Sequence, residues 1–488
     1  MTDTPETATS SLKQKTAGTL KWNTVDRVAS QVLYGVVGIV LANIVSQEDF
    51  GLVGALLVFQ GFAIIFADSG FGAALLRQKH TTEQDYSTVF WFNLIVSIAI
   101  YFILWFCAPL IADIFQHDRR LIPLSKVMFL TFVLNALSIV QTNRLMKLMD
   151  VKMIAVSNVI AQTAGGGLGI GLALGGWGAW ALVWQSVCLA GVKTAILWIK
   201  GGWVPKYWIH KDSFKKIWRI GVSVFSSAML TNIFQTIYSF VIGAWYSLVS
   251  LGIYTQADKW SKMGSASLSQ VFTASFVPLL ARVQDNMETF HRYVKKINRF
   301  TAFISFPILL WLTVAGAPLF HTLFGNKWDA AILLFQILCV RWLFILLISL
   351  YGNYMLALGY GKKVFVIEVI KDVTILVAIL ATIWFKSVAL LVWGQLWAAI
   401  VAFAIILWLT SRKMEYKVRN MLGDIIPFLI ISIFACVCCY LFSFIGLPPI
   451  LTLIIEFFSF SLVYLAIMYV GKWPELKEAW SYITGKLI

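Results

Sequence analysis

The stretch that decides the fold is DAAILLFQILCVRWLFILLISLYGNYMLA, residues 329–357. After Asp329 its only charged side chain is Arg341, and a helix needs about 20 apolar residues to cross a bilayer. The stretch therefore predicts a transmembrane helix. Of the 488 residues 59% are hydrophobic and 13% are charged, against about 25% charged in globular domains. This composition indicates a polytopic membrane protein and excludes soluble enzymes, DNA-binding modules and disordered scaffolds.

Apolar segments of spanning length recur along the chain. They are 20–45, 50–67, 86–112, 121–140, 153–174, 178–199, 218–245, 251–279, 298–322, 329–357, 364–385, 388–410, 424–445 and 449–471. The polar segment 1–17 lacks a signal-peptide pattern, so we interpret it as a tail. The sequence thus predicts an all-α polytopic membrane protein with 14 transmembrane helices and both termini on one side of the membrane.

The distribution of basic residues predicts the orientation. If the N-terminus is cytoplasmic, 28 of the 39 lysines and arginines fall on the inside and four, at 119, 120, 327 and 386, fall on the outside. Cytoplasmic loops carry an excess of Lys and Arg, so both termini are expected to be cytoplasmic. The net charge of +16 then reflects topology rather than nucleic-acid binding. The predicted outside loops are short, which argues against a glycosyltransferase or polymerase with a large outer catalytic domain.

An internal repeat is predicted at an offset of about 201 residues. Phe50-Gly51-Leu52 corresponds to Leu251-Gly252-Ile253, and polar residues recur at matching places in helices 1 and 7. Two parallel six-helix repeats around a central cavity are a transporter architecture. The expected parts are an N-terminal tail (1–17), an N-lobe of helices 1–6 (18–199), a cytoplasmic linker (200–217), a C-lobe of helices 7–12 (218–411), helices 13–14 (412–471) and a cytoplasmic C-terminal tail (472–488).

Helix 1 carries a polar stripe inside the membrane. Asn23, Asp26, Arg27, Ser30, Gln31 and Tyr34 are spaced so that they share one face of a helix. Ionisable residues at membrane depth are costly and usually face a cavity or a partner. We expect this stripe to face a cavity; a structural salt bridge from Asp26 or Arg27 to another helix is the alternative. Asn23, Arg27 and Gln31 are therefore candidate substrate-binding residues.

Further polar positions lie on helices 7, 8 and 10. Asn232 and Gln235 on helix 7, Lys259 on helix 8 and Arg341 on helix 10 are candidate substrate-binding residues, although Lys259 could instead extend to the membrane surface. Cations in the cavity suit an anionic substrate, and arginine binds phosphate through paired hydrogen bonds. The candidate residues for ion coupling or gating are the three carboxylates Asp26, Asp68 and Asp258.

The remaining motifs indicate no catalysis. The glycines of helix 5 form the pairs Gly165/Gly169, Gly167/Gly171 and Gly171/Gly175, which predict close helix contacts rather than a phosphate loop. Six cysteines lie in apolar segments, and neither they nor the five histidines show metal-binding spacing. We therefore expect no enzyme activity, no catalytic or metal-binding residues and no cofactor, and we expect energy from an H⁺ or Na⁺ gradient, the membrane potential or the substrate gradient.

Several short motifs together resemble the bacterial polysaccharide flippases. They are Asp49-Phe50-Gly51, Asp68-Ser69-Gly70-Phe71-Gly72, Gly176-Trp177-Gly178-Ala179-Trp180, Leu251-Gly252-Ile253-Tyr254-Thr255-Gln256-Ala257-Asp258-Lys259, Phe276-Val277-Pro278 and Phe324-Gly325-Asn326-Lys327-Trp328. Their order is similar to that of the Wzx-type branch of the multidrug/oligosaccharidyl-lipid/polysaccharide (MOP) exporter superfamily. Lipid II flippases of that superfamily use an acid–arginine pair on helix 1 and a cation on helix 8, where this chain has Asp26, Arg27 and Lys259.

The resemblance implies a function in surface polysaccharide synthesis. A protein of this family would flip polyprenyl-diphosphate-linked oligosaccharides across the bacterial inner membrane by alternating access, for lipopolysaccharide O-antigen, capsule or exopolysaccharide. Its expected partners are that lipid-linked substrate, membrane lipids and the polysaccharide polymerase machinery, and not nucleic acid. A cation-coupled multidrug exporter of the same superfamily and a membrane glycosyltransferase or polymerase remain as alternatives.

Overall fold

The computed structural model describes residues 5–68, 70–78 and 81–484, and this part of the chain contains helices and no strand. The chain divides into two compact units, residues 1–252 (unit 1) and 253–488 (unit 2). Each of the 14 predicted spans is helical, although 86–112, 121–140 and 298–322 are each divided between two helices, and ten helical stretches in the described part are long and apolar enough to cross a membrane. The structure is thus that of an all-helical multi-pass membrane protein, and the count of 14 spans stays a prediction.

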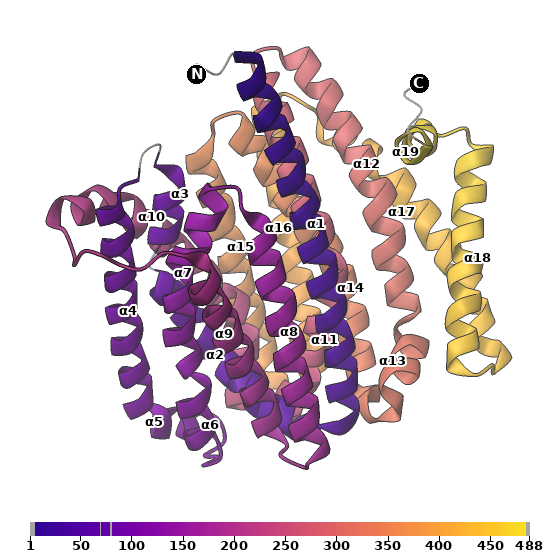
Figure 1. The fold of residues 1–488 in the computed structure, drawn as a ribbon. Coiled ribbons are helices and arrows are strands. Elements are labelled where there is room, and N and C mark those ends of the chain that lie inside the picture. The colour runs from indigo at the N-terminus through magenta and orange to yellow at the C-terminus, as the bar shows by residue number, and fades with distance from the viewer. Residues whose placement is uncertain (1–4, 69, 79–80, 485–488) are drawn as a thin grey trace. The chain divides into compact units, whose positions relative to one another are not determined.

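Unit 1 is built from ten helices in its described part, most of them running side by side (Figure 1). They are α1 (Pro5–Ile44), α2 (Gln47–Asp68), α3 (Phe71–Arg77), α4 (Glu83–Phe106), α5 (Ala108–Ile114), α6 (Leu121–Met128), α7 (Leu130–Lys147), α8 (Val151–Leu174), α9 (Ala179–Gly201) and α10 (Lys211–Trp245). Helix α8 packs against α1 and α9, and α10 packs against α2, α3 and α4.

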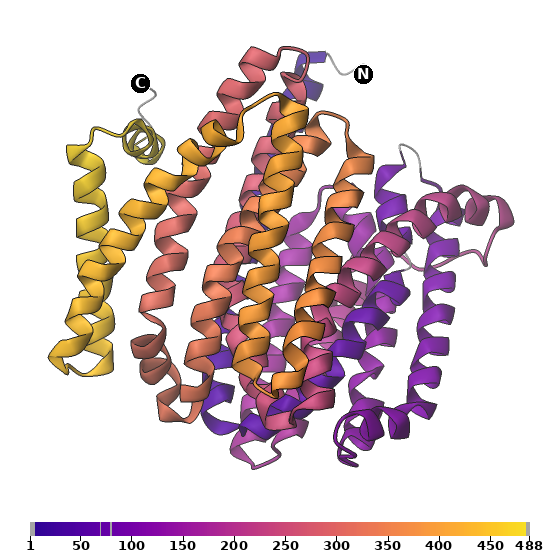
Figure 2. The same ribbon diagram turned by 180° about the vertical axis from the view of Figure 1, so that it is seen from behind.

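Unit 2 contains the remaining long helices (Figure 2). They are α11 (Leu248–Arg282), which begins in the last residues of unit 1, α12 (Met287–Val314), α13 (Gly316–Phe324), α14 (Asp329–Ala357), α15 (Gly361–Thr382), α16 (Val388–Met414), α17 (Val418–Tyr440), α18 (Pro449–Val470) and α19 (Pro474–Thr484), with 3₁₀ turns at Gly325–Trp328, Ile383–Phe385 and Leu441–Ile445. Both views show α19 end-on, so it runs across α17 and α18.

Some helices differ from the predicted spans. The predicted span 86–112 is two helices, because the chain breaks at Cys107 and Pro109 lies in the first turn of α5. The span 298–322 likewise breaks at Ala315 into α12 and α13. Helix α1 begins at Pro5, within the predicted tail, and α19 lies within the predicted C-terminal tail. The last two differences arise because polar helical turns extend beyond the apolar segments that hydropathy detects.

The boundary between the units falls after α10. The sequence places a lobe boundary at 200–217, whereas the compact units divide between Gly252 and Ile253. Helix α10 stays with unit 1 because it packs on α2, α3 and α4. The preceding segment is also fixed to α4, since the indole of Trp91 donates to the carbonyl of Tyr207 at 3.0 Å and the His210 amide donates to Thr88 Oγ1 at 3.0 Å.

The glycines of α8 contribute close packing at three positions, and two of these, Gly165 and Gly169, form one of the predicted pairs. A Cβ on Gly165 would lie 2.8 Å from the carbonyl oxygen of Gln185 in α9, and one on Gly169 would lie 2.9 Å from the Gln185 Cβ. Gly166 packs on Val37 of α1. The prediction was wrong for the pair at 167 and 171, where added Cβ atoms would meet nothing within 4 Å.

Candidate functional site

The polar stripe of α1 is divided between two environments. Asp26 and Ser30 are half-buried. The Asp26 carboxylate accepts two hydrogen bonds from Asn158 Nδ2 on α8, at 3.0 and 3.2 Å, and one from Ser30 Oγ at 3.2 Å. The partner that α8 supplies to Asp26 is therefore an uncharged amide, not the basic residue of the salt-bridge alternative.

A cation from a third helix lies in the electrostatic range of this carboxylate. Lys193 on α9 is half-buried, and Asp26 is the charged group that acts on it. Sequence reasoning placed neither Asn158 nor Lys193 in a site, because an isolated polar residue in a glycine-rich helix and a lysine towards a span end have ordinary explanations. Helices α1, α8 and α9 thus bring an acid, an amide and a base into one region of unit 1.

Arg27 lies on the exposed side of the polar stripe of α1. Its side chain is exposed, and within the described residues it makes no hydrogen bond or ion pair. Asn23 is also exposed, and Gln31 is half-buried one turn further along. An arginine at membrane depth without a carboxylate partner is available for an anionic ligand.

A cavity of about 550 Å³ in unit 1 contains the two residues predicted on helix 7. It is lined by Ile65 of α2 and by Val224, Ser227, Ala228, Thr231, Asn232 and Gln235 of α10. Asn232 packs on Gly61 of α2, where a Cβ would lie 2.8 Å from the amide nitrogen and oxygen. The Asn232 Nδ2 atom is buried beside Gly61 and has no hydrogen-bond partner in the described structure.

The predicted residues of unit 2 have different surroundings. Asp258 forms an ion pair with Lys262 one turn later, at 2.6 Å, so its charge is compensated within α11. The Lys259 ammonium lies 5.3 Å from the centroid of the Trp260 ring. Arg341 on α14 lies 5.5 Å from the Trp342 ring, and no described carboxylate pairs with it. Arg341 thus resembles Arg27 of unit 1 in having no carboxylate partner among the described residues.

Two other carboxylates complete the survey of candidates. The side chain of Asp68 lies outside the described part of the structure. Asp372 on α15 is 4% exposed, and its Oδ1 has no partner among the described residues. Its neighbours Glu368 and Lys371 are paired with each other. The sequence alone did not single out Asp372, because an acid close to another acid and a lysine on one helix has an ordinary structural explanation.

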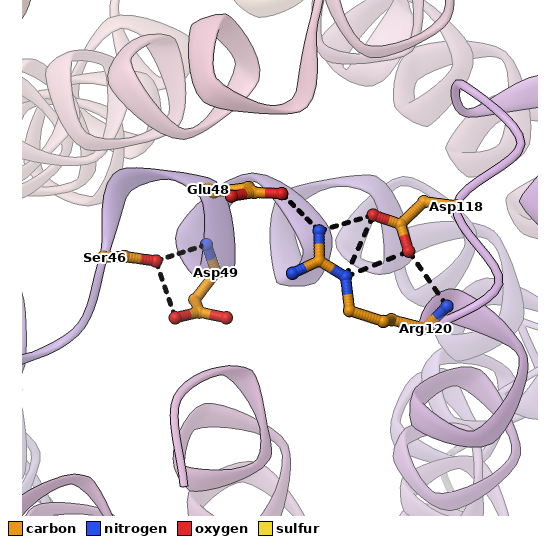
Figure 3. A network of polar contacts seen from close by, with 5 residues as sticks. All are labelled: Ser46, Glu48, Asp49, Asp118 and Arg120. Atoms are coloured by element: carbon orange, nitrogen blue, oxygen red, sulfur yellow. Dashed lines mark hydrogen bonds and ion pairs between the residues drawn. The ribbon is translucent and has the colours of Figure 1, made fainter. Parts of the chain in front are cut away.

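A separate polar network connects α2 to the segment before α6 (Figure 3). The Arg120 guanidinium binds both Glu48 and Asp118, with Nη2 at 2.6 Å from Asp118 Oδ2. Ser46 Oγ accepts a hydrogen bond from the Asp49 amide at 3.0 Å, which fixes the first turn of α2. The hydrogen bonds from Arg120 hold the pKa of Asp118 below its usual range. Arg120, one of the four basic residues predicted outside, is thus neutralised by two acids.

These features define a multi-pass helical membrane protein with polar and basic groups on its membrane-spanning helices. A family model described as "Polysaccharide biosynthesis protein" matches residues 40–333, more than half of the chain, and the chain belongs to this family.

Curated relatives share about a quarter of their residues with this chain. The teichuronic acid biosynthesis protein TuaB of Bacillus subtilis is 23% identical over 84% of this chain and 85% of its own. The lipopolysaccharide biosynthesis protein WzxC of Escherichia coli is 24% identical over 68% and 67%. The succinoglycan biosynthesis transport protein ExoT of Rhizobium meliloti is 23% identical over 64% and 63%.

Solved structures confirm the fold. The lipid II flippase MurJ in an inward closed conformation aligns with a TM-score of 0.74 over 92% of this chain and 98% of its own, at 14% identity. An inward-facing multidrug resistance transporter of the MATE family, in the MOP superfamily, aligns with a TM-score of 0.58 over 81% and 99%, at 16% identity. The resemblance to the MOP fold inferred from the motifs is confirmed.

Proposed function

We propose that this protein is a flippase that moves polyprenyl-diphosphate-linked oligosaccharides across the bacterial inner membrane for surface polysaccharide synthesis. The observation that carries the proposal is the presence of Arg27 and Arg341, two arginines on long apolar helices with no carboxylate partner among the described residues. An arginine in that state suits a diphosphate, which offers several oxygens for paired hydrogen bonds. Membership of the polysaccharide biosynthesis family supports the same substrate class.

The proposed mechanism is alternating access between two parallel six-helix repeats. The head group would bind Arg27, Arg341 and Lys259, with Asn23, Gln31, Asn232 and Gln235 binding the sugars. In support of that role, Asn232 and Gln235 both line a cavity. Both termini would be cytoplasmic, and the polysaccharide polymerase machinery would take over the product.

Asp26 is the candidate for coupling to H⁺ or Na⁺. Its carboxylate lies on the helix of Arg27 and is held by Asn158, so a change in its charge would act close to that arginine. The other two candidates, Asp68 and Asp258, stay in the proposal, and Asp258 is paired with Lys262.

The test is to locate lipid-linked glycan by leaflet in cells lacking this gene and complemented with variants. Completed units should accumulate on the cytoplasmic side without the gene. Arg27→Ala should fail to restore export while still reaching the membrane, and Arg27→Lys should restore it only in part because lysine cannot form the paired hydrogen bonds. Arg119→Ala, which removes an exposed loop cation, is the matched control. Normal export by Arg27→Ala would refute the site, and truncated glycans would point to a transferase.

A multidrug exporter is the second candidate, favoured by the likeness to the MATE fold and by the membrane carboxylate Asp26. Expression in a drug-sensitive strain separates the two functions. Raised drug resistance that requires Asp26, with no change in glycans on deletion, would establish the exporter.

A further inference from the structure

A basic cavity lies in unit 2, between the beginning of α15 and the end of α16. Its volume is about 550 Å³. One side carries three cations, Lys363, Arg412 and Lys413. The rest of the wall is apolar and is formed by Met355, Val366, Ile367, Trp408 and Leu409.

The cations of this cavity lack acidic partners. Lys363 and Lys413 come from different helices and lie side by side, and the adjacent Lys413 ammonium is the main cause that lowers the pKa of Lys363. Arg412 stacks on Trp408, 4.2 Å from the ring centroid. Within the described residues no carboxylate forms an ion pair with any of the three. Like charges this close repel each other, and an anion bound beside Lys363 and Lys413 would offset this repulsion.

Helix dipoles explain only part of this arrangement. Arg412 and Lys413 occupy the last turn of α16, where cations interact favourably with the negative end of the helix. Lys363 occupies the first turn of α15, where a cation meets the positive end, and no side chain caps this end. Lys363 therefore meets two unfavourable interactions, one with the positive end of α15 and one with the Lys413 ammonium. An anion bound beside Lys363 would interact favourably with all three groups.

The apolar wall indicates the kind of anion. Trp408 and Val366 are 48% and 50% exposed, although both are large apolar side chains on helices that the sequence predicts to be transmembrane. A free phosphate would contact only the cations, whereas a lipid phosphate would also place its chains along the apolar wall. Basic cavities between transmembrane helices are known to bind anionic lipid head groups. We propose that this cavity binds the phosphate head group of an anionic glycerophospholipid.

The test is lipid binding to the purified full-length protein, measured by native mass spectrometry in detergent. Phosphatidylglycerol, phosphatidylcholine and undecaprenyl phosphate are titrated separately, and inorganic phosphate is added as a competitor. Phosphatidylglycerol should bind in preference to phosphatidylcholine. The variant Lys363→Ala/Lys413→Ala should weaken phosphatidylglycerol binding by about thirtyfold, as expected for two basic residues near an anionic head group.

Two further variants make the test specific. Lys363→Arg/Lys413→Arg keeps the charges and should keep binding, and Lys417→Ala/Lys477→Ala removes two exposed lysines of unit 2 that do not line this cavity. The alanine variant should melt in lipid-free detergent no lower than the wild type, which shows that it folds. Equal binding of the two phospholipids, or equal loss in the control, would overturn the proposal. Complete competition by inorganic phosphate would assign the cavity to free anions, and preference for undecaprenyl phosphate would assign it to the polyprenyl carrier.

Discussion

Gly51 and Gly252 meet where the first turns of α2 and α11 cross. A Cβ on Gly252 would lie 3.0 Å from the Gly51 amide nitrogen and would overlap the carbonyl oxygen of Gln47. A Cβ on Gly51 would overlap the carbonyl oxygen of Leu248. The two helices begin at Gln47 and Leu248, 201 residues apart (248 − 47), which is the offset of the predicted repeat. The absence of both side chains is what lets the two backbones touch.

We expect Gly51→Ala and Gly252→Ala each to destabilise the protein by about 1–3 kcal/mol, the usual cost of overpacking. The measurement is thermal unfolding of the purified protein in detergent, followed by tryptophan fluorescence. Gly167→Ala is the control, because a Cβ there meets nothing within 4 Å and alanine favours the helix. If all three variants melt alike, the backbone contact does not contribute to stability.

The hydrogen bonds between Asp26 and Asn158 should be measurable as a coupling energy. Hydrogen bonds to a charged group contribute about 1.5–3 kcal/mol. In a double-mutant cycle with Asp26→Asn and Asn158→Ala, the unfolding free energies should therefore be non-additive. Ser30→Ala, which removes the other donor to Asp26, serves as a comparison and should couple more weakly. Additive effects of the first pair would show that the amide does not hold the carboxylate.

If the cavity lined by α10 binds part of an anionic substrate, a negative charge introduced into its lining should weaken substrate binding. Asn232→Asp changes charge with almost no change in size, so we expect it to lower glycan export more than Asn232→Ala does. Asn43→Asp, at an exposed position of α1, is the matched charge control. The assay is export in complemented cells, normalised to protein in the membrane. Export retained with aspartate at 232 would exclude this cavity from the substrate path.

The Arg120–Asp118 interaction gives stability a pH dependence of known sign. The pKa of Asp118 is lower in the folded protein than in the unfolded chain. Its contribution to the free energy of unfolding is therefore present above the pKa of the unfolded state and is lost as the pH falls through the pKa of the folded state. Melting temperatures measured from neutral to acidic pH should fall less steeply for Asp118→Asn than for wild type. Asp285→Asn, which removes an exposed acid that forms no ion pair within the described residues, should follow the wild-type profile.

The apolar spans could be read from the sequence because burial in lipid requires long, continuous runs such as 329–357. The polar turns beyond them could not, which is why the beginning of α1 and all of α19 were missed as helices. The helix 7 residues Asn232 and Gln235 were predicted from a repeated pattern, and both line a cavity. Asn158 was missed because its role depends on which helix packs beside α1, and hydropathy carries no information about helix neighbours.

The place of α10 in unit 1 has a practical consequence for dividing this chain into two co-expressed fragments. A cut in the segment 202–210 would separate the α10 lining of the cavity from α2 and would break the hydrogen bonds that fix this segment to α4. A cut at residues 246–247, between α10 and α11, leaves that lining with the helices on which it packs. Reassembly of a working split transporter should therefore succeed at the second position and fail at the first.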